Sequence, residues 1–142
     1  MNARLYADGA ARGNPGPAGS GAALVAPDGT VIAEMTRFLG HATNNVAEYT
    51  ALIIGLEEAS RREIGHLDVR MDSLLVVQQM KGLWRIKHPG LKPLALQAGA
   101  LLAGFPSRTI EHIPREQNGI ADALANRAID QARERTVEQD RT

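Results

Sequence analysis

Along the first forty residues, apolar and polar positions follow the two-residue period of β-strands. Leu5 and Ala7 alternate with polar neighbours near the N-terminus, and a later run of small apolar residues indicates a covered strand. The pair Asp28-Gly29 favours a hairpin turn into a further strand. The pattern therefore predicts an antiparallel meander of three consecutive strands, over residues 3–10, 19–26 and 30–39.

From residue 43 onward, the apolar positions recur with the spacing of a helix. Thr43 and the two asparagines after it can cap free N–H groups, and Gly65 follows the last periodic residues, so we expect a helix between these points. The segment 82–93 is basic and rich in loop-forming residues. The remaining predicted elements are a strand over 66–71, helices over 73–81 and 94–103, a strand over 107–113, and a helix from 118 through 132.

This order of elements predicts an α/β fold. The last two strands follow helical crossovers and should therefore lie parallel to the first strand. We expect a five-stranded mixed sheet, with three antiparallel strands followed by two parallel ones, flanked by helices on both faces. The chain of 142 residues has the length of one domain. We place that domain at residues 1–130 and expect residues 131–142 to form a polar, frayed tail or linker stub.

The composition narrows the possible functions without choosing one. Sixteen basic and sixteen acidic residues leave no net charge, so bulk charge does not favour nucleic-acid binding. All three lysines, however, lie between residues 81 and 92 and could form a local phosphate-binding patch. The absence of cysteine excludes disulfides, a thiolate zinc site and a cysteine nucleophile. With no signal-like start and no bilayer-length apolar stretch, we expect a cytoplasmic protein without membrane contact.

Four acidic residues occupy unusual positions in the predicted fold. Asp8 lies within the first strand, where aspartate is disfavoured, and Asp72 directly follows the fourth strand. Glu48 and Asp122 fall in the first turns of two helices. Ligand crevices in α/β sheets lie at strand ends near helix N-termini, so all four acids could meet there. Clustered carboxylates repel one another, and Mg²⁺ or Mn²⁺ would relieve that repulsion. Each acid taken alone could equally be a helix cap or a solvated charge.

The segments around these acids resemble the four motifs of the type 1 ribonuclease H family, in the family's order. The similarity covers residues 3–130, and its motifs are the segments 6–19, 43–52, 71–73 and 114–125. The resemblance implies the ribonuclease H-like fold. It also implies an endonuclease that hydrolyses the RNA strand of RNA–DNA hybrids by a two-metal-ion mechanism, leaving 5′-phosphate and 3′-OH ends.

The resemblance also implies roles for individual residues. Two Mg²⁺ ions, with Mn²⁺ as a possible substitute, would bind Asp8, Glu48, Asp72 and Asp122. In the family Glu48 also accepts a hydrogen bond from a ribose 2′-OH, and the threonine at position 43 contacts a DNA phosphate. The positions implied to contact the hybrid are Gly9, Asn14, Thr43, Asn44 and Asn45.

Two departures from the family pattern affect the predicted site. The loop before the last helix lacks the histidine that many members carry, and Arg115 is its expected functional substitute. His112, in the preceding strand, could take that place or could be a packed strand residue. The basic substrate-binding handle is also shortened. Within it, Lys87 could bind phosphate, and Trp84 could stack near a sugar or cover the core.

Two other functions remain open at this point. A non-catalytic nucleic-acid-binding module on the same fold would be expected to lack one carboxylate, and all four are present. A 3′–5′ exonuclease of the same superfamily would have a different motif order. We expect a monomer. Similar domains occur fused to other enzymes, including phosphatase-like domains, and the polar C-terminus would suit a linker to such a partner.

Overall fold

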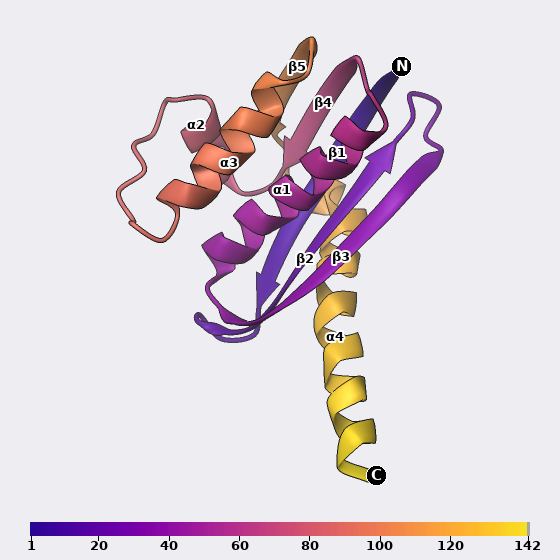
Figure 1. Ribbon diagram of the computed structural model, residues 1–142, viewed down its shortest axis with the longest axis vertical. Coiled ribbons are helices and arrows are strands. Elements are labelled where there is room, and N and C mark those ends of the chain that lie inside the picture. The colour runs from indigo at the N-terminus through magenta and orange to yellow at the C-terminus, as the bar shows by residue number, and fades with distance from the viewer. Residues whose placement is uncertain (142) are drawn as a thin grey trace.

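The computed structural model describes the backbone of residues 1–141 and the side chains of residues 1–139 (Figure 1). The strands are β1 (Asn2–Ala11), β2 (Gly16–Val25), β3 (Val31–Ala42), β4 (His66–Met71) and β5 (Ser107–His112). The helices are α1 (Asn44–Arg61), α2 (Leu74–Met80), α3 (Lys92–Ala103), the 3₁₀ turn η1 (Arg115–Gln117) and α4 (Gly119–Arg141). The predicted order of strands and helices is confirmed.

The five strands form one mixed sheet in the order β3-β2-β1-β4-β5. β1 pairs antiparallel with β2, and β2 with β3, through short hairpin connections. β4 pairs parallel with β1, and β5 with β4, because helices carry the chain back between them. The predicted α/β fold is therefore confirmed, and β1, with Asp8 near its end, lies at the centre of the sheet.

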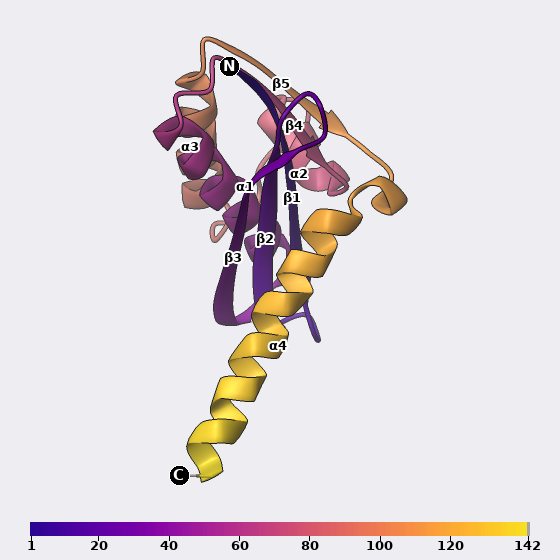
Figure 2. The same ribbon diagram turned by 90° about the vertical axis from the view of Figure 1, so that its right-hand side faces the viewer.

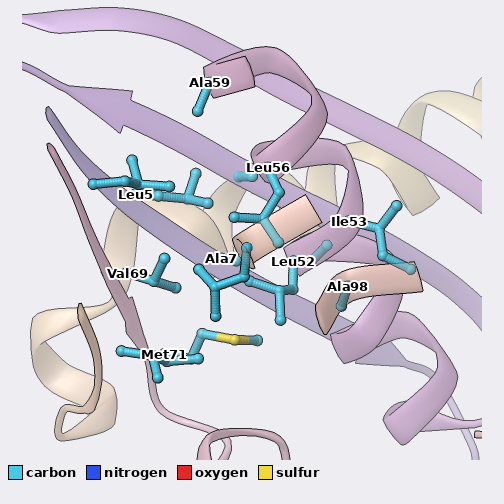
Figure 3. Close-up of a cluster of buried hydrophobic side chains, with 14 of the residues drawn as sticks. Leu5, Ala7, Leu52, Ile53, Leu56, Ala59, Val69, Met71 and Ala98 are labelled. Carbon is cyan, nitrogen blue, oxygen red and sulfur yellow. The ribbon is translucent and has the colours of Figure 1, made fainter. Parts of the chain in front are cut away.

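One face of the sheet is covered by α1, with α3 packed beside it (Figures 1 and 3). Leu5 and Val69 project from neighbouring strands into a cluster that contains Leu52 and Leu56 of α1, all of them fully buried. Burying a side chain of this size contributes about 1.5–3 kcal/mol. This packing fixes α1, and with it Glu48, against the central strand.

The opposite face is covered by α4, which packs mainly on β1 and β2 (Figure 2). A side chain at Gly21 would overlap with the backbone of Ala125, so glycine permits the close approach of this helix. The predicted end of the last helix near residue 132 is wrong, because α4 continues to Arg141 and projects beyond the sheet. The assignment of residues 131–142 as a polar tail or linker stub after the domain stays a prediction. The apolar stripe stops near Ala132, but the following residues are mostly good helix formers.

Several predicted boundaries shift by a few residues. Thr43 caps α1 as expected, its Oγ1 accepting from the N–H of Val46 at 3.2 Å. The helix ends at Arg61 rather than running toward Gly65, and Glu63 adopts the left-handed conformation with φ of 56°. α3 begins at Lys92, two residues before the prediction, because proline is well tolerated in the first turn of a helix.

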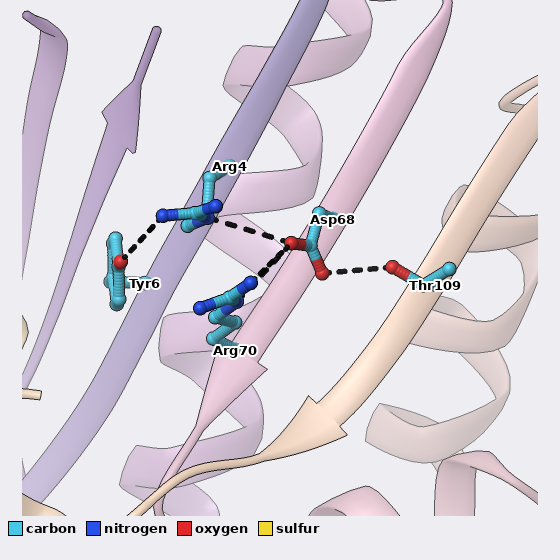
Figure 4. A network of polar contacts seen from close by, with 5 residues as sticks. All are labelled: Arg4, Tyr6, Asp68, Arg70 and Thr109. Atoms are coloured by element: carbon cyan, nitrogen blue, oxygen red, sulfur yellow. Dashed lines mark hydrogen bonds and ion pairs between the residues drawn. The ribbon is translucent and has the colours of Figure 1, made fainter. Parts of the chain in front are cut away.

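A polar network joins three strands on the sheet face that carries α4 (Figure 4). Asp68 of β4 lies at its centre and accepts a hydrogen bond from Thr109 at 2.8 Å. Its other carboxylate oxygen lies 3.0 Å from Arg70 Nη2 and 3.5 Å from Arg4 Nε. The negative charge of Asp68 is thus compensated by two guanidinium groups.

In the described part of the chain, no helix is both long and apolar enough to cross a membrane.

Candidate active site

The four predicted acids line one cavity of about 400 Å³ at the carboxyl end of β1. Five elements or their adjoining loops contribute to its wall, although they are far apart in the sequence. The lining residues are Asp8, Gly9, Ala10, Ala11, Arg12, Asn44, Glu48, Asp72, Ser73, Arg115, Asp122 and Asn126. The structure therefore brings Gly9, Asn44 and Arg115 together with the acids in one cavity, and their roles there stay predictions.

Gly9 sets the distance between Asp8 and Glu48. A Cβ atom at Gly9 would overlap with the backbone of Ala47 and Glu48, so only glycine lets the first turns of α1 lie directly on β1. The backbone N–H of Gly9 also donates a hydrogen bond to the Glu48 carboxylate. Asp8 and Glu48 are each only 5% exposed as a result.

Asn118 orients Asp72 through a hydrogen bond, although Asn118 itself does not line the cavity. Its side chain is fully buried, and Nδ2 donates to Asp72 Oδ1 at 2.7 Å and to the carbonyl of Ala7 at 3.0 Å. The Asn118 carbonyl also accepts from the N–H of Asp122 at 3.0 Å, in the first turn of α4. The sequence indicated Asn118 only as a helix start, and the residue in fact connects β1, Asp72 and α4.

Burial and mutual repulsion make the two innermost acids hard to ionise. Loss of solvent raises the pKa of Asp8 to about 7, and the charges of Asp72 and Asp122 add to this effect. A hydrogen bond with Glu48 opposes part of that rise. Burial also raises the pKa of Glu48 well above its usual value, with the Asp8 charge as the next cause. At neutral pH the cavity therefore favours a bound proton or a bound cation.

The donor groups of the cavity fit a hard divalent cation. Glu48 Oε2 is buried and has no hydrogen-bond partner, so one oxygen is left available for a ligand. Carboxylate oxygens are the donors that Mg²⁺ and Mn²⁺ prefer. No three His, Cys, Asp or Glu side chains in the described residues already stand in metal-binding positions, so small side-chain rotations would have to accompany binding.

Arg115 and His112 differ in their relation to the cavity. Arg115 lies in η1 and lines the cavity. His112 is exposed at the end of β5, and its Nε2 is 3.2 Å from the backbone carbonyl of Asp72. The alternative that His112 is a packed strand residue is therefore wrong. Its ring is not among the groups that line the cavity.

Three of the predicted substrate-contacting residues line a second, smaller cavity of about 170 Å³. Asn14, Thr43 and Asn45 form its wall together with His88 and Leu91. Asn14 Oδ1 accepts from the N–H of Asn44 at 3.0 Å, which joins the β1–β2 loop to the start of α1. Because Asn44 lines the acidic cavity, the two cavities are neighbours.

The basic loop that follows α2 lies further from the acids. Trp84 is 43% exposed, so it only partly covers the core, and Lys87 is exposed. Neither residue is among those lining the two cavities. Gln79 Nε2 donates to the carbonyl of Arg85 at 3.3 Å and thereby holds the loop against α2.

The sheet order and the acids gathered at its central strand define a domain of the ribonuclease H-like class. Comparison with known proteins agrees with this class. A family model described as reverse transcriptase-like matches residues 6–128. The structure of a ribonuclease H1 from Halobacterium salinarum superposes with a TM-score of 0.89 at 46% identity, covering 92% of this chain and 99% of that one. The chain belongs to the ribonuclease H family.

Two relatives are similar at the sequence level over most of this chain. The bifunctional protein Rv2228c of Mycobacterium tuberculosis is 50% identical over 133 residues, which are 93% of this chain and 36% of that protein. The ribonuclease HI of Halobacterium salinarum is 48% identical over 127 residues, which are 89% of this chain and 64% of that protein. The chain thus spans about a third of the first relative's length and somewhat under two thirds of the second's.

A third relative has been solved with nucleic acid. The structure of LC11-RNase H1 in complex with an RNA/DNA hybrid superposes with a TM-score of 0.86 at 41% identity. The match covers 92% of this chain and 98% of that one.

Proposed function

We propose that this protein is an endonuclease that hydrolyses the RNA strand of RNA–DNA hybrids. The observation that carries the proposal is the cavity in which Asp8, Glu48, Asp72 and Asp122 converge without enough positive charge to balance them. Among the residues that the structure describes, the cationic side chains in its lining are those of Arg12 and Arg115. Such a site suits a substrate that arrives with divalent cations.

The four carboxylates would hold two Mg²⁺ ions, or Mn²⁺ in their place. Bound there, the ions would supply an activated water and stabilisation of the leaving 3′-oxygen, so that the products carry 5′-phosphate and 3′-OH ends. The protein's own groups orient the ligands: Gly9 donates to Glu48, and Asn118 donates to Asp72. The unpartnered Glu48 Oε2 supports its place among the ligands.

The hybrid would bind across both cavities. Glu48 would accept a hydrogen bond from a ribose 2′-OH, the group that distinguishes RNA from DNA. Gly9, Asn14, Thr43, Asn44 and Asn45 would contact the backbones of the hybrid. A relative 41% identical to this chain has been solved with an RNA/DNA hybrid, which supports the proposal that this protein binds a hybrid. Lys87 and Trp84, in the exposed loop after α2, would contact the hybrid outside the cavities.

Arg115 would bind a phosphate group at the edge of the acidic cavity. A guanidinium group stays protonated at every relevant pH and offers donors only. Arg115 therefore cannot shuttle protons as a histidine would. Its role would be to neutralise charge on the phosphate that is cut.

A cleavage assay with a defined substrate tests the proposal. The substrate is a duplex whose labelled strand carries a few ribonucleotides between DNA arms, with both ends blocked, and the reaction contains Mg²⁺ or EDTA. We expect internal cuts in the RNA segment that require the divalent ion and never occur in all-DNA duplexes. Hybrid binding without cleavage would indicate a non-catalytic binding module, and cleavage only at unblocked ends would indicate an exonuclease. Either result would contradict the proposal.

The oligomeric state, the cellular location and the domain organisation of the protein are also proposals. We expect it to act as a monomer in the cytoplasm and to use residues 1–130 as its nuclease domain. The relative Rv2228c is bifunctional, and a solved structure of its N-terminal RNase H domain superposes with a TM-score of 0.88. This relative supports the proposal that the nuclease domain is fused to a second, C-terminal enzyme domain in the protein as it occurs in the cell.

A further inference from the structure

Arg12 and Asn126 lie in the wall of the acidic cavity but have no part in the proposed chemistry. Arg12 follows β1, and its backbone N–H donates to the carbonyl of Pro17 at 2.9 Å, which closes the β1–β2 loop. Its guanidinium group reaches across to α4. There Nη1 lies 2.8 Å from Asp130 Oδ1, and Nη2 donates to Asn126 Oδ1 at 3.4 Å.

The contact with Arg12 decides which way the Asn126 amide faces. A guanidinium group has only donors, so the oxygen of the amide must point toward Arg12. Nδ2 consequently points toward Asp122, where it donates to the backbone carbonyl at 3.0 Å and to carboxylate Oδ1 at 3.4 Å. Asp122, Asn126 and Asp130 are spaced four residues apart and therefore lie along one face of α4.

This chain of contacts contributes little to folding stability. The side chains of Arg12 and Asp130 are 33% and 57% exposed. Ion pairs with such exposure are weak because water and salt screen them. The position of the contacts is more informative than their strength, because they end on one of the four acids.

Two of the other three cavity acids also have a hydrogen-bond donor from the protein. Asn118 donates its side-chain amide to Asp72, and the backbone N–H of Gly9 donates to Glu48. Asn126 gives Asp122 the corresponding donor. Partners of this kind fix the orientation of metal-binding carboxylates. Asp130 meanwhile engages the charge of Arg12, which would otherwise be available to pair with the cavity acids in competition with a cation.

We propose that Arg12 and Asn126 are positioning residues that orient the Asp122 carboxylate toward the cavity, with Asp130 as the anchor of Arg12. The inference rests on the proposed nuclease function, because it requires Asp122 to be a metal ligand. Arg12 and Asn126 thereby connect the β1–β2 loop, which contains Asn14, to Asp122.

The test compares Asn126→Ala, Arg12→Ala and the double variant with the unmodified protein. Cleavage of an RNA–DNA hybrid is measured over a range of Mn²⁺ concentrations, and Mn²⁺ binding to the hybrid-free protein is measured by the electron paramagnetic resonance of the free ion. For Asn126→Ala we expect the Mn²⁺ concentration for half-maximal cleavage to rise about tenfold or more. The KM for the hybrid should change by less than about twofold, since only interactions with the substrate would alter it.

Arg12→Ala should cause a smaller shift in the same direction. The double variant should be no worse than Asn126→Ala, because both residues act through the same carboxylate. The Mn²⁺ affinity of the hybrid-free protein should fall in the same order. Arg62→Ala is the control, since it removes another partly exposed arginine–acid pair, at the C-terminal end of α1 and outside the cavity lining, and should leave all these values unchanged.

The outcomes separate this inference from the proposed function. An unchanged Mn²⁺ midpoint and unchanged Mn²⁺ affinity in Asn126→Ala would overturn the positioning role. So would a raised hybrid KM with an unchanged metal midpoint in Arg12→Ala, which would indicate direct substrate contact. If the unmodified protein cuts no hybrid, the nuclease proposal fails while Mn²⁺ binding still tests the positioning. Asn126→Leu keeps the size of the side chain and replaces Asn126→Ala if the latter does not fold.

Discussion

Two polar clusters on the same sheet, one around the single acid Asp68 and one containing four acids, differ in how negative charge is balanced. Asp68 on β4 contacts two arginines and a threonine hydroxyl, and its charge is compensated within the protein (Figure 4). Asp8 on β1 is more deeply buried and has other acids as its neighbours. A compensated charge can stay ionised without a ligand, whereas buried acids without compensating charge favour the binding of a proton or a cation. The contrast supports the proposal that the second cluster is the functional one.

The largest expected effect comes from neutralising one acid in each cluster. Asp72→Asn should lower the rate of hybrid cleavage by about 10³-fold or more, the scale of losing a major electrostatic contribution to catalysis. Hybrid binding, measured by gel shift, should change only a few-fold. Asp68→Asn should leave the cleavage rate within about twofold of the original, a change too small to reflect loss of transition-state stabilisation. Comparable losses in both variants would remove the distinction between the clusters.

The spacing between β1 and α1 can be tested next. Gly9→Ala would place a methyl group against the backbone of Ala47 and Glu48, which cannot move aside as a flexible side chain would. We expect a loss of about 2–3 kcal/mol in the free energy of unfolding, typical of overpacking, together with reduced cleavage.

Gly99→Ala provides the matched control, since a Cβ there meets nothing within 4 Å. Gly99 lies inside α3, so alanine should stabilise the protein by about 0.5–1 kcal/mol. Urea unfolding measures both variants. Equal stability of the two would show that β1 and α1 are not in close contact at Gly9.

The pH dependence of stability should report the uncompensated acids. The pKa of Asp8 is raised to about 7 in the folded state, and the pKa of Glu48 is raised as well. Between pH 4 and 7 the folded protein therefore binds more protons than the unfolded chain, so stability should fall as pH rises through this window. In EDTA we expect the melting temperature to drop on the order of 5 °C over the window.

Mg²⁺ should reverse that loss, and more strongly at pH 8 than at pH 5, because it binds the ionised carboxylates. Thermal melts at both pH values, with EDTA or Mg²⁺, provide the measurement. A melting temperature that is independent of Mg²⁺ at pH 8 would contradict a metal site among these acids.

The smallest effect should come from the compensated cluster. Asp68→Ala removes the shared partner of Arg4 and Arg70, whose side chains are 44% and 28% exposed. We expect a loss of only about 1 kcal/mol in unfolding free energy, reduced further at high salt, because partly exposed ion pairs are weak. A loss of several kcal/mol in unfolding free energy would contradict this expectation, because it would mean that the arginines are left as buried, unpaired charges.

Much of the fold could be predicted because its signals are local. The two-residue period before residue 40 and the helical period after it reflect which side chains each segment must bury. Asp28-Gly29 and Thr43 signal a turn and a helix start within a few residues of themselves. The predicted end of the last helix at residue 132 was wrong. The apolar stripe shows which part of α4 contacts the sheet, and it does not show how far the helix extends.

The site was predictable only in part, because some of its residues are defined by contacts between distant parts of the chain. Acids at strand ends and helix starts are visible in the sequence, and the family motifs around them gave their order. The residues that orient them were not visible. Asn118 marked only the start of a predicted helix, and no pattern in the sequence singled out Arg12 or Asn126. Their roles depend on partners that are close only after folding.

The sequence by itself determined the order of strands and helices and the α/β class, because both are encoded by short-range patterns, and it placed four acids at strand ends and helix starts. The tertiary structure alone decided how these acids are held and how hard they are to ionise. Asn118 meets Ala7 across 111 positions of the chain, and Arg12 meets Asn126 across 114. Such contacts, and the burial that shifts the pKa of Asp8, arise only when the helices pack on the sheet and exclude water.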